Sequence, residues 1–306
     1  LGETIELRTR TMARDGVRVP QDCQTLKAAI ALVESNDRLT TIVLGKGKHF
    51  GAMYGGVDNP SYETQYNTLE ISSLCSIVGD PSVAKEEIVV VGGIWFKIRI
   101  QGTCHLQHLT IIAAVYGVIG LSSYTMEDVL VEQCETGVVA LGTDVVVQCT
   151  NVEVRQCVMS GVVASHGASI TLIGTETSVH HNCTEIPDYY DPDPDLLGDG
   201  EGYGLAVFGF NSHAIQQVSP FSTIQLVSPL TKDTVSKDNR SISGQNRNWG
   251  ADEDSRIDQI KTIPLKQAMA EAERLRARIG NEKVEEFTQE TKLSDAPKFG
   301  ISRIKK

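Results

Sequence analysis

Residues 117–185 decide the fold, and they read GVIGLSSYTMEDVLVEQCET, then GVVALGTDVVVQCTNVEVRQCVMS, then GVVASHGASITLIGTETSVHHNCTE. Each unit begins with Gly-Val, at Gly117, Gly137 and Gly161, so the sequence repeats at a roughly constant interval. Inside the units, short runs alternate apolar and other side chains, as in Val129/Val131, and Leu109/Ile111 match this pair in the preceding stretch. Period-two alternation predicts strands, and these runs are too short for helices. Because so small a unit cannot bury its apolar face alone, the stretch predicts strands stacked unit upon unit.

Cysteines recur at one place in this repeat. Cys134 and Cys157 each follow a strand valine at the same short distance, in the matching phrases VLVEQC and VEVRQC. In stacked units they would lie one above the other, about 4.8 Å apart. Cys183, in VHHNC, comes one position later. Free cysteine is among the most buried residue types, so we expect an interior column of thiols. A metal site is the alternative, although stacked thiolates do not converge tetrahedrally.

Short strands, glycines at coil corners and a repeat unit of this length together resemble the right-handed parallel β-helices of the pectin-lyase-like superfamily. Members include pectate lyases, polygalacturonases, pectin methylesterases, phage tailspikes (structural spikes) and the non-enzymatic β-helix modules of some F-box proteins. The resemblance implies an all-β solenoid, a single-stranded right-handed parallel β-helix with an N-terminal capping helix and a C-terminal helical extension. It implies no particular activity, because this architecture carries several chemistries and also none.

Three parts are expected along the chain. Residues 1–19 are predicted to form an N-terminal arm, residues 20–250 the parallel β-helix, and residues 251–306 a helical C-terminal extension with a basic tail. Two stretches without periodicity, 50–68 and 186–203, are expected as loop insertions. Long loops on a rigid scaffold are where function tends to sit.

A capping helix is predicted after the arm, because a stacked sheet whose first coil is uncovered would expose its core and its edge hydrogen bonds. Asp22, Gln24 or Thr25 can cap this helix. Its apolar residues share one face, namely Leu26, Ala29, Ile30 and Val33. A second amphipathic helix is expected from Pro264 to Gly280, either covering the last coil or docking on another protein.

The net charge of −11 is unevenly distributed. Between Arg99 and Lys232 the only basic residue is Arg155, so the solenoid is not expected to bind nucleic acid, which requires clustered Lys and Arg. No apolar run is long enough to span a bilayer, so no membrane span is expected. Seven cysteines, an odd number with inward positions, favour a reducing intracellular compartment or organelle lumen. The sequons at Asn182 and Asn239 leave secretion or a virion open.

Binding residues are expected in the two insertions. Tyrosines in the first could stack on sugar rings or pack onto the solenoid, and tyrosines beside an aspartate mark the second: Tyr54, Tyr62, Tyr66, Asp188, Tyr189 and Tyr190. The second insertion is acidic, with no basic residue, which indicates a solvated loop. Calcium is the alternative, with Asp191, Asp193, Asp195 and Asp199 as its ligands, although their spacing does not match an EF-hand. No other cofactor is expected.

Catalytic candidates are few. A glycoside hydrolase needs two carboxylates about 5–9.5 Å apart. The acids stacked on neighbouring coils are Asp128, Glu132, Glu135 and Glu153, and Arg155 is the one base available for a lyase. Ser165-His166-Gly167 and Arg303-Ile304-Lys305 echo two polygalacturonase motifs, but no Asn-Thr-Asp or Asp-Asp accompanies them. His180 and His181 are expected to point to opposite sides of a strand, which argues against a metal pair.

The sequence therefore predicts a structural or recognition protein without catalysis. It would be a rigid β-helix scaffold that binds a protein partner, or a glycan, within a larger assembly. The alternative is a carbohydrate-active enzyme, a polysaccharide hydrolase or lyase of the same fold.

Overall fold

The computed structural model describes residues 16–36, 38–51, 68–183, 202–208, 221–240, 244–252 and 255–261. Of these residues 49% lie in strands and 8% in helices, so the fold is mostly parallel β-sheet with few helices. No helix in these ranges is long and apolar enough to cross a bilayer. The chain divides into two compact units, residues 1–260 and 261–306, and the second lies outside the described residues except for Lys261.

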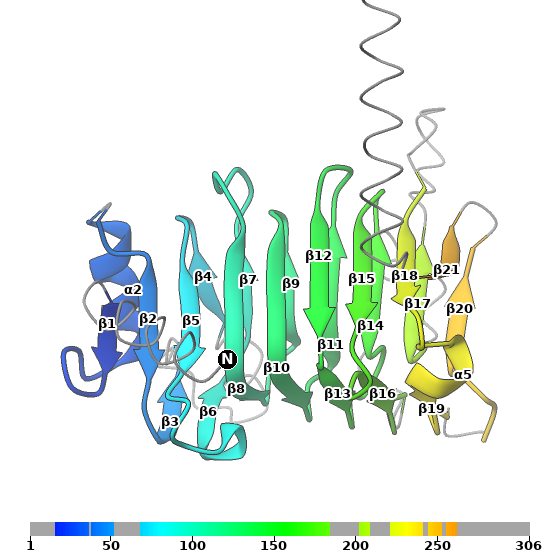
Figure 1. Ribbon diagram of the computed structural model, residues 1–306, viewed down its shortest axis with the longest axis horizontal. Coiled ribbons are helices and arrows are strands. Elements are labelled where there is room, and N and C mark those ends of the chain that lie inside the picture. The colour runs from blue at the N-terminus through cyan, green and yellow to red at the C-terminus, as the bar shows by residue number, and fades with distance from the viewer. Residues whose placement is uncertain are drawn as a thin grey trace, which may run out of the picture. The chain divides into compact units, whose positions relative to one another are not determined.

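The larger of two sheets is formed by strands that follow one another in sequence order (Figure 1). Its main path is β1 (Gly16–Val19), β2 (Thr41–Leu44), β5 (Ser76–Gly79), β8 (Cys104–Ile112), β10 (Tyr124–Glu132), β12 (Val146–Thr150), β15 (Ser169–Ile173), β18 (Thr223–Val227) and β21 (Arg256–Ile260). Further strands pair alongside this path: β3 (Gly47–Phe50), β6 (Ile88–Val91), β13 (Glu153–Arg155), β16 (Ser178–His180) and β19 (Ser236–Lys237).

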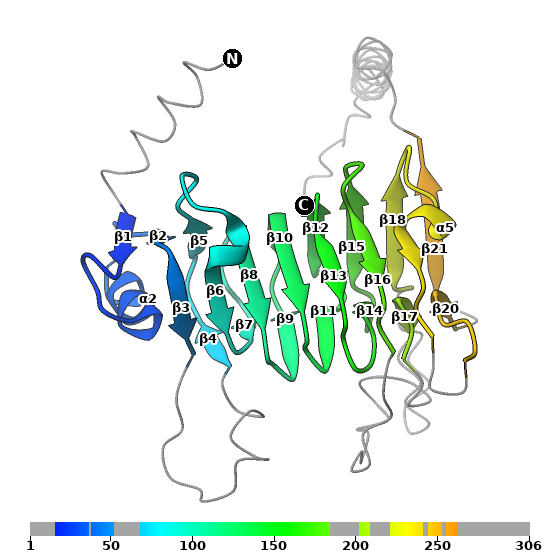
Figure 2. The same ribbon diagram turned by 90° about the horizontal axis from the view of Figure 1, so that it is seen from below.

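The smaller sheet lies along the other side of the same strand stack (Figure 2). It contains β4 (Leu69–Ile71), β7 (Ile94–Phe96), β9 (Tyr116–Gly120), β11 (Thr136–Leu141), β14 (Val162–Ser165), β17 (Leu205–Phe208) and β20 (Trp249–Ala251). From β5 to β20 the chain repeats the same course. A strand of the main path comes first, followed either by a strand alongside that path or by the second half of the same long strand. A strand of the smaller sheet completes the course. We call each such course a rung.

The strand register confirms the predicted repeat. Leu109 pairs with Val129 and Ile111 with Val131, one repeat unit further along the chain, as the alternation indicates. Val131 in turn pairs with Val154. The named strands pair in parallel throughout, so one column of side chains runs through many rungs.

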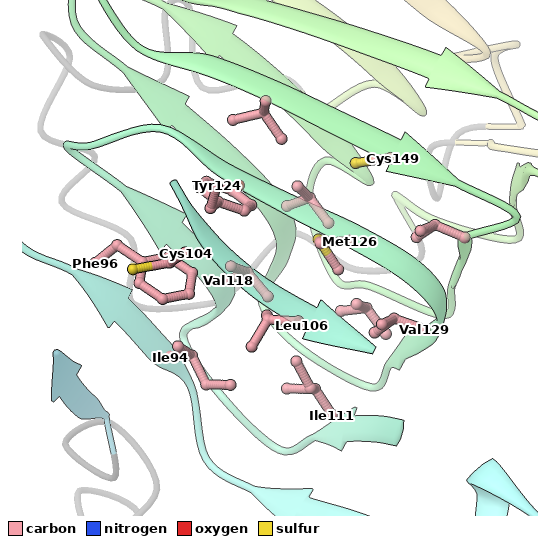
Figure 3. Packing of buried hydrophobic residues seen from close by; sticks show 14 of the residues in the cluster. Ile94, Phe96, Cys104, Leu106, Ile111, Val118, Tyr124, Met126, Val129 and Cys149 are labelled. Carbon is pink, nitrogen blue, oxygen red and sulfur yellow. The ribbon is translucent and has the colours of Figure 1, made fainter. Parts of the chain in front are cut away.

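Side chains from the two sheets meet in one apolar core. Figure 3 shows Leu106 and Ile111 of the larger sheet facing Ile94 and Val118 of the smaller one. The Phe96 and Tyr124 rings pack with their centroids 5.1 Å apart. The Tyr124 hydroxyl, fully buried, donates to the Val139 carbonyl at 3.0 Å, so its polar atom is satisfied.

Short helices flank the sheets, and the first matches the predicted capping helix. Helix α2 (Leu26–Glu34) buries the predicted face, and the Thr25 side chain accepts from the Ala28 N–H at 3.1 Å as its N-cap. The others are a 3-10 turn, η1 (Lys85–Glu87), and α5 (Lys232–Val235).

The sheets extend beyond the predicted 20–250 boundaries. Gly16–Val19, placed in the arm by the sequence analysis, forms β1 and pairs with β2. At the other end, β21 pairs with β18 and buries Ile257. In both segments the alternation of apolar and polar residues is too short for the sequence pattern to distinguish a strand from an irregular arm. Residues 1–15 of the predicted arm and the predicted helix from Pro264 to Gly280 lie outside the described residues.

The glycines that open each unit are required by close approach. A Cβ on Gly137 would lie 2.4 Å from the Gly161 carbonyl oxygen, 2.5 Å from Val154 Cγ1 and 3.3 Å from Cys157 Sγ. Gly117 and Gly161 are enclosed in the same way by the strand valine and the unit's polar or thiol side chain. These contacts, and not a left-handed backbone, exclude any larger residue.

The interior column of thiols is confirmed, and it changes chemistry along the stack. Cys134 and Cys157 are 1% and 0% exposed. Burial raises the pKa of the Cys134 thiol to about 12. In the next rungs the column continues with Asn182 and Asn239, both 0% exposed. Asn182 Nδ2 donates to the Val154 carbonyl at 3.2 Å and to Asn239 Oδ1 at 2.9 Å.

This burial corrects the interpretation of the two sequons. The side-chain amides of Asn182 and Asn239 are enclosed and hydrogen-bonded across rungs, so neither is an accessible glycan acceptor in the folded protein. The two triplets carry no information about secretion.

The burial of the thiols predicts their reactivity. In native buffer a thiol reagent should label Cys23, the one partly exposed cysteine, and leave the six buried cysteines unreacted. In denaturant all seven should react. Mass spectrometry of the labelled chain measures both, and rapid native labelling of Cys134 and Cys157 would contradict the inward register.

The glycine contacts predict a stability loss. Gly137→Ala should reduce the free energy of unfolding by about 1–3 kcal/mol, because the added methyl must displace a backbone carbonyl and a packed valine. Urea denaturation measures the change. Val146→Ala, at a side chain 55% exposed, is the control and should change stability by less than about 0.5 kcal/mol. Equal effects of the two substitutions would show that Gly137 is not close-packed.

Candidate functional site

Ionisable side chains gather along the second strands of the larger sheet, on the side facing away from the core. They come from η1, β8, β10, β13, β16 and the residue that follows β16, which lie in successive rungs. They form two groups: Lys85, His108 and Asp128 in one, and Glu132, Glu153, Arg155, His180 and His181 in the other.

The first group is centred on Asp128. Its carboxylate accepts from Lys85 Nζ and from His108 Nδ1, both at 2.6 Å. His108 Nε2 lies 2.7 Å from the Val83 carbonyl oxygen, which can only accept. Both contacts are therefore satisfied by a ring with a proton on each nitrogen. His108 and Asp128 are in-register neighbours with left-handed backbones, φ 54° and 51°, which turns both side chains out at one corner.

The electrostatics of this group keep Asp128 ionised. Partial burial acts to raise the pKa of the Asp128 carboxyl, but the hydrogen bonds and positive charges of Lys85 and His108 outweigh it. The pKa of Asp128 is thus lowered from its usual value. A carboxylate held in this way is a poor proton donor.

The second group is centred on Arg155. Its Nε and Nη2 atoms each lie 2.8 Å from Glu132 Oε2, and its Nη1 atom lies 2.8 Å from Glu153 Oε1. The structure thus brings three of the predicted catalytic candidates together, but it joins them to one another. The guanidinium spans both acids, and its two contacts to Glu132 share one carboxylate oxygen.

Glu135 differs from the other acids on these strands. Burial raises the pKa of its carboxyl. Among the described residues, no ion pair to this side chain is found. It lies at the corner between β10 and β11, one position beyond the buried Cys134.

The two adjacent histidines differ from the sequence expectation. His180 Nδ1 and His181 Nδ1 lie 2.7 Å apart, with the rings nearly perpendicular at 82°. The prediction that they point to opposite sides is wrong, because His181 has a left-handed backbone, φ 55°, and leaves the strand there. His180 Nε2 also contacts Glu153 Oε1 at 3.1 Å.

The outer face of the smaller sheet carries a second apolar cluster. Val139 and Val163, which alternate with core residues, are 1% and 0% exposed although they lie on the side away from the core. An aromatic ring with a cation over it stands at each end of this cluster. Lys97 Nζ lies 3.6 Å from the Trp95 ring centroid, and the Arg247 guanidinium lies 5.1 Å from that of Tyr203.

Both predicted insertions connect to the smaller sheet at the same corner. The first joins β3 to β4, and the second joins β16 to β17, in each case between a strand of the larger sheet and one of the smaller. The predicted binding residues Tyr54, Tyr62, Tyr66, Asp188, Tyr189 and Tyr190 lie outside the described residues. The calcium candidates Asp191, Asp193, Asp195 and Asp199 also lie outside them.

The polygalacturonase-like fragment at Ser165 forms a turn. Ser165 Oγ lies 2.8 Å from His166 Nδ1, and Ser165 is 1% exposed. His166 and Gly167 have positive φ, 58° and 85°. Arg303 lies outside the described residues, so the second fragment has no described position.

Two members of the site were missed by the sequence analysis, Lys85 and His108. His108 precedes Asp128 by one repeat unit, the same interval that separates Gly117 from Gly137, so the column could have been found by applying the repeat to polar positions. Lys85 sits in η1, an insertion within its rung, and no periodicity places it there.

Comparison of the chain with protein-family models, with curated proteins and with solved structures finds no match.

The Asp128 group generates a pH-dependent prediction. Asp128→Asn should reduce the free energy of unfolding by about 1 kcal/mol at pH 7, because Lys85 and His108 lose their shared partner. Asparagine tolerates the left-handed backbone, so the substitution removes charge without strain. Because the pKa of Asp128 is lower in the folded state, its ionised carboxylate contributes stability at pH values above its unfolded-state pKa of about 3.9. This contribution is lost as the pH falls through the lower folded-state pKa.

The difference between wild type and Asp128→Asn should therefore shrink as the pH falls from about 4 toward 2. Urea denaturation across this range measures it. The control is Asp144→Asn, an exposed acid outside the group, which should change stability little at any pH. A loss that is the same at pH 7 and pH 2 would refute the ion-pair explanation.

Proposed function

We propose that the two sheets close into a right-handed parallel β-helix of the pectin-lyase-like kind. Three features support this. The strands pair in parallel from rung to rung. Both sheets contribute to one core, as Ile111 and Val118 do. Finally, parallel crossover connections are right-handed in nearly all proteins.

The proposed function is a non-catalytic one: a rigid scaffold that binds a protein partner or a glycan within a larger assembly. The observation that carries it is the pairing of the predicted catalytic residues. Asp128 is held by Lys85 and His108, while Glu132 and Glu153 are held by Arg155. General acid or base catalysis requires a group that can release or take up a proton near the working pH. The Asp128 carboxyl, whose pKa is lowered, does not meet this requirement, and the Glu132 and Glu153 carboxylates are occupied by Arg155.

Recognition is supported by the surface beside the insertions. Trp95 and Tyr203 are partly exposed aromatic rings at the two ends of a buried apolar cluster, beside the sheet to which the two insertions connect. Aromatic residues and arginine are enriched at binding surfaces, where aromatic rings supply a large contact area.

The alternative is a polysaccharide hydrolase, and one observation favours it. Burial raises the pKa of the Glu135 carboxyl, and Glu135 follows closely in the chain on Glu132, a second carboxyl that is paired with Arg155. This combination is the one that glycosidases use for acid and nucleophile.

An assay of turnover distinguishes the two. The protein is expected to release no reducing ends or unsaturated products from pectate, alginate or neutral glycans, with or without calcium, between about pH 4 and 9. The variants Glu132→Gln, Glu135→Gln and Glu153→Gln should behave like the wild type. Cleavage by the wild type that is lost on substitution of Glu135 together with Glu132 or Glu153 would establish the hydrolase instead.

A further inference from the structure

His180 and His181 are placed as two converging nitrogen donors. Their Nδ1 atoms are joined by a hydrogen bond of 2.7 Å, and their ring centroids are 4.9 Å apart. In an extended strand, neighbouring side chains point to opposite faces and could not meet. They meet here because the chain turns at His181, whose φ is 55°. The convergence is therefore a product of the corner.

We propose that His180 and His181 form a chelating site for a divalent transition-metal ion of the Zn²⁺, Ni²⁺ or Cu²⁺ class. Neutral imidazole is the preferred donor for these ions. With metal–nitrogen bonds of about 2.0–2.1 Å, two nitrogens on one tetrahedral ion lie about 3.3 Å apart. The observed separation reaches that value by a small rotation of the His181 ring, which is solvent-exposed.

Glu153 orients the His180 ring through the nitrogen that faces away from His181. Its Oε1 atom lies 3.1 Å from His180 Nε2, so that nitrogen carries the proton and Nδ1 is the acceptor of the hydrogen bond from His181 Nδ1. An ion bound by both Nδ1 atoms takes the place of the proton between them, which is released on binding. A carboxylate behind a ligating histidine is a common arrangement in metal sites, because it fixes the tautomer and the ring orientation. Glu153 is itself fixed by Arg155 at 2.8 Å.

The charged side chains around the histidine pair do not prevent a cation from binding. The positive charge of Arg155 is offset by the two acids that hold it, Glu132 and Glu153. Lys237 pairs with His180 on the next rung, and its side chain is exposed and can extend into water. Continuing that register places Asp238 beside His181, at the same left-handed corner with φ 56°.

The remaining coordination positions are left to water and to Asp238. No group of three metal-ligating side chains is assembled within the described residues. The Asp238 carboxylate is exposed, and rotation of its side chain would bring it toward the histidine pair. The site is thus of modest affinity and open to solvent, and it does not depend on whether the protein is a scaffold or an enzyme.

Calorimetric titration of the full chain with NiCl₂ and with ZnCl₂ tests the site. Every protein carries Cys23→Ser, which removes the one partly exposed thiol as a competing ligand. We expect one ion per chain. His180→Gln or His181→Asn should weaken binding at least tenfold, and asparagine tolerates the left-handed backbone of residue 181. Glu153→Gln should weaken it by about 10-fold, since it keeps both rings but removes the orienting charge.

The control is His105→Gln, which removes a partly buried histidine from β8 and should leave binding unchanged. Calcium and magnesium, which prefer oxygen ligands, should produce no binding at the pair. A cobalt-loaded sample should show imidazole coordination without a thiolate charge-transfer band. The proposal is overturned if the wild type binds neither Ni²⁺ nor Zn²⁺ at millimolar concentration. Equal affinity in His181→Asn and wild type would also overturn it.

Discussion

The structure depends on how closely successive rungs approach at the unit glycines. At Gly137 the carbonyl of the next glycine, the strand valine and the column cysteine all lie where a Cβ would stand. A side chain there would separate the rungs and break the hydrogen bonds that join them. The parallel register, the shared core and the interior column all require the rungs to stay at strand spacing, so they follow from this contact.

The interior column shows how the same position accepts different chemistry. Cys134 and Cys157 need no hydrogen-bond partner and fill it as small apolar groups. Asn182 and Asn239 are polar and fully buried, which would be costly if their amides were unsatisfied. They bond to each other and to neighbouring carbonyls, so the column changes from packing to hydrogen bonding without interrupting the stack.

The corners with positive φ determine what the surface can do. In β8 and β10, His108 and Asp128 have left-handed backbones and form an ion pair with each other. After the end of β16, the left-handed backbone of His181 brings its side chain to that of His180. Away from the corners the acids of the second strands are tied by Arg155. Acids from several rungs are thereby ion-paired with cations from neighbouring positions of the stack.

Local patterns in the sequence were enough to predict the strands, the register that pairs Leu109 with Val129, the interior cysteines and the buried face of the capping helix. Each depends on side-chain period, which neighbouring residues determine by themselves. Only the tertiary structure decided the rest. The φ of His181, the pairing of Lys85 with Asp128 and the burial of Asn182 depend on which residues the rungs stack together. The reason is that contacts across rungs join positions one or more repeat units apart, and no local period encodes them.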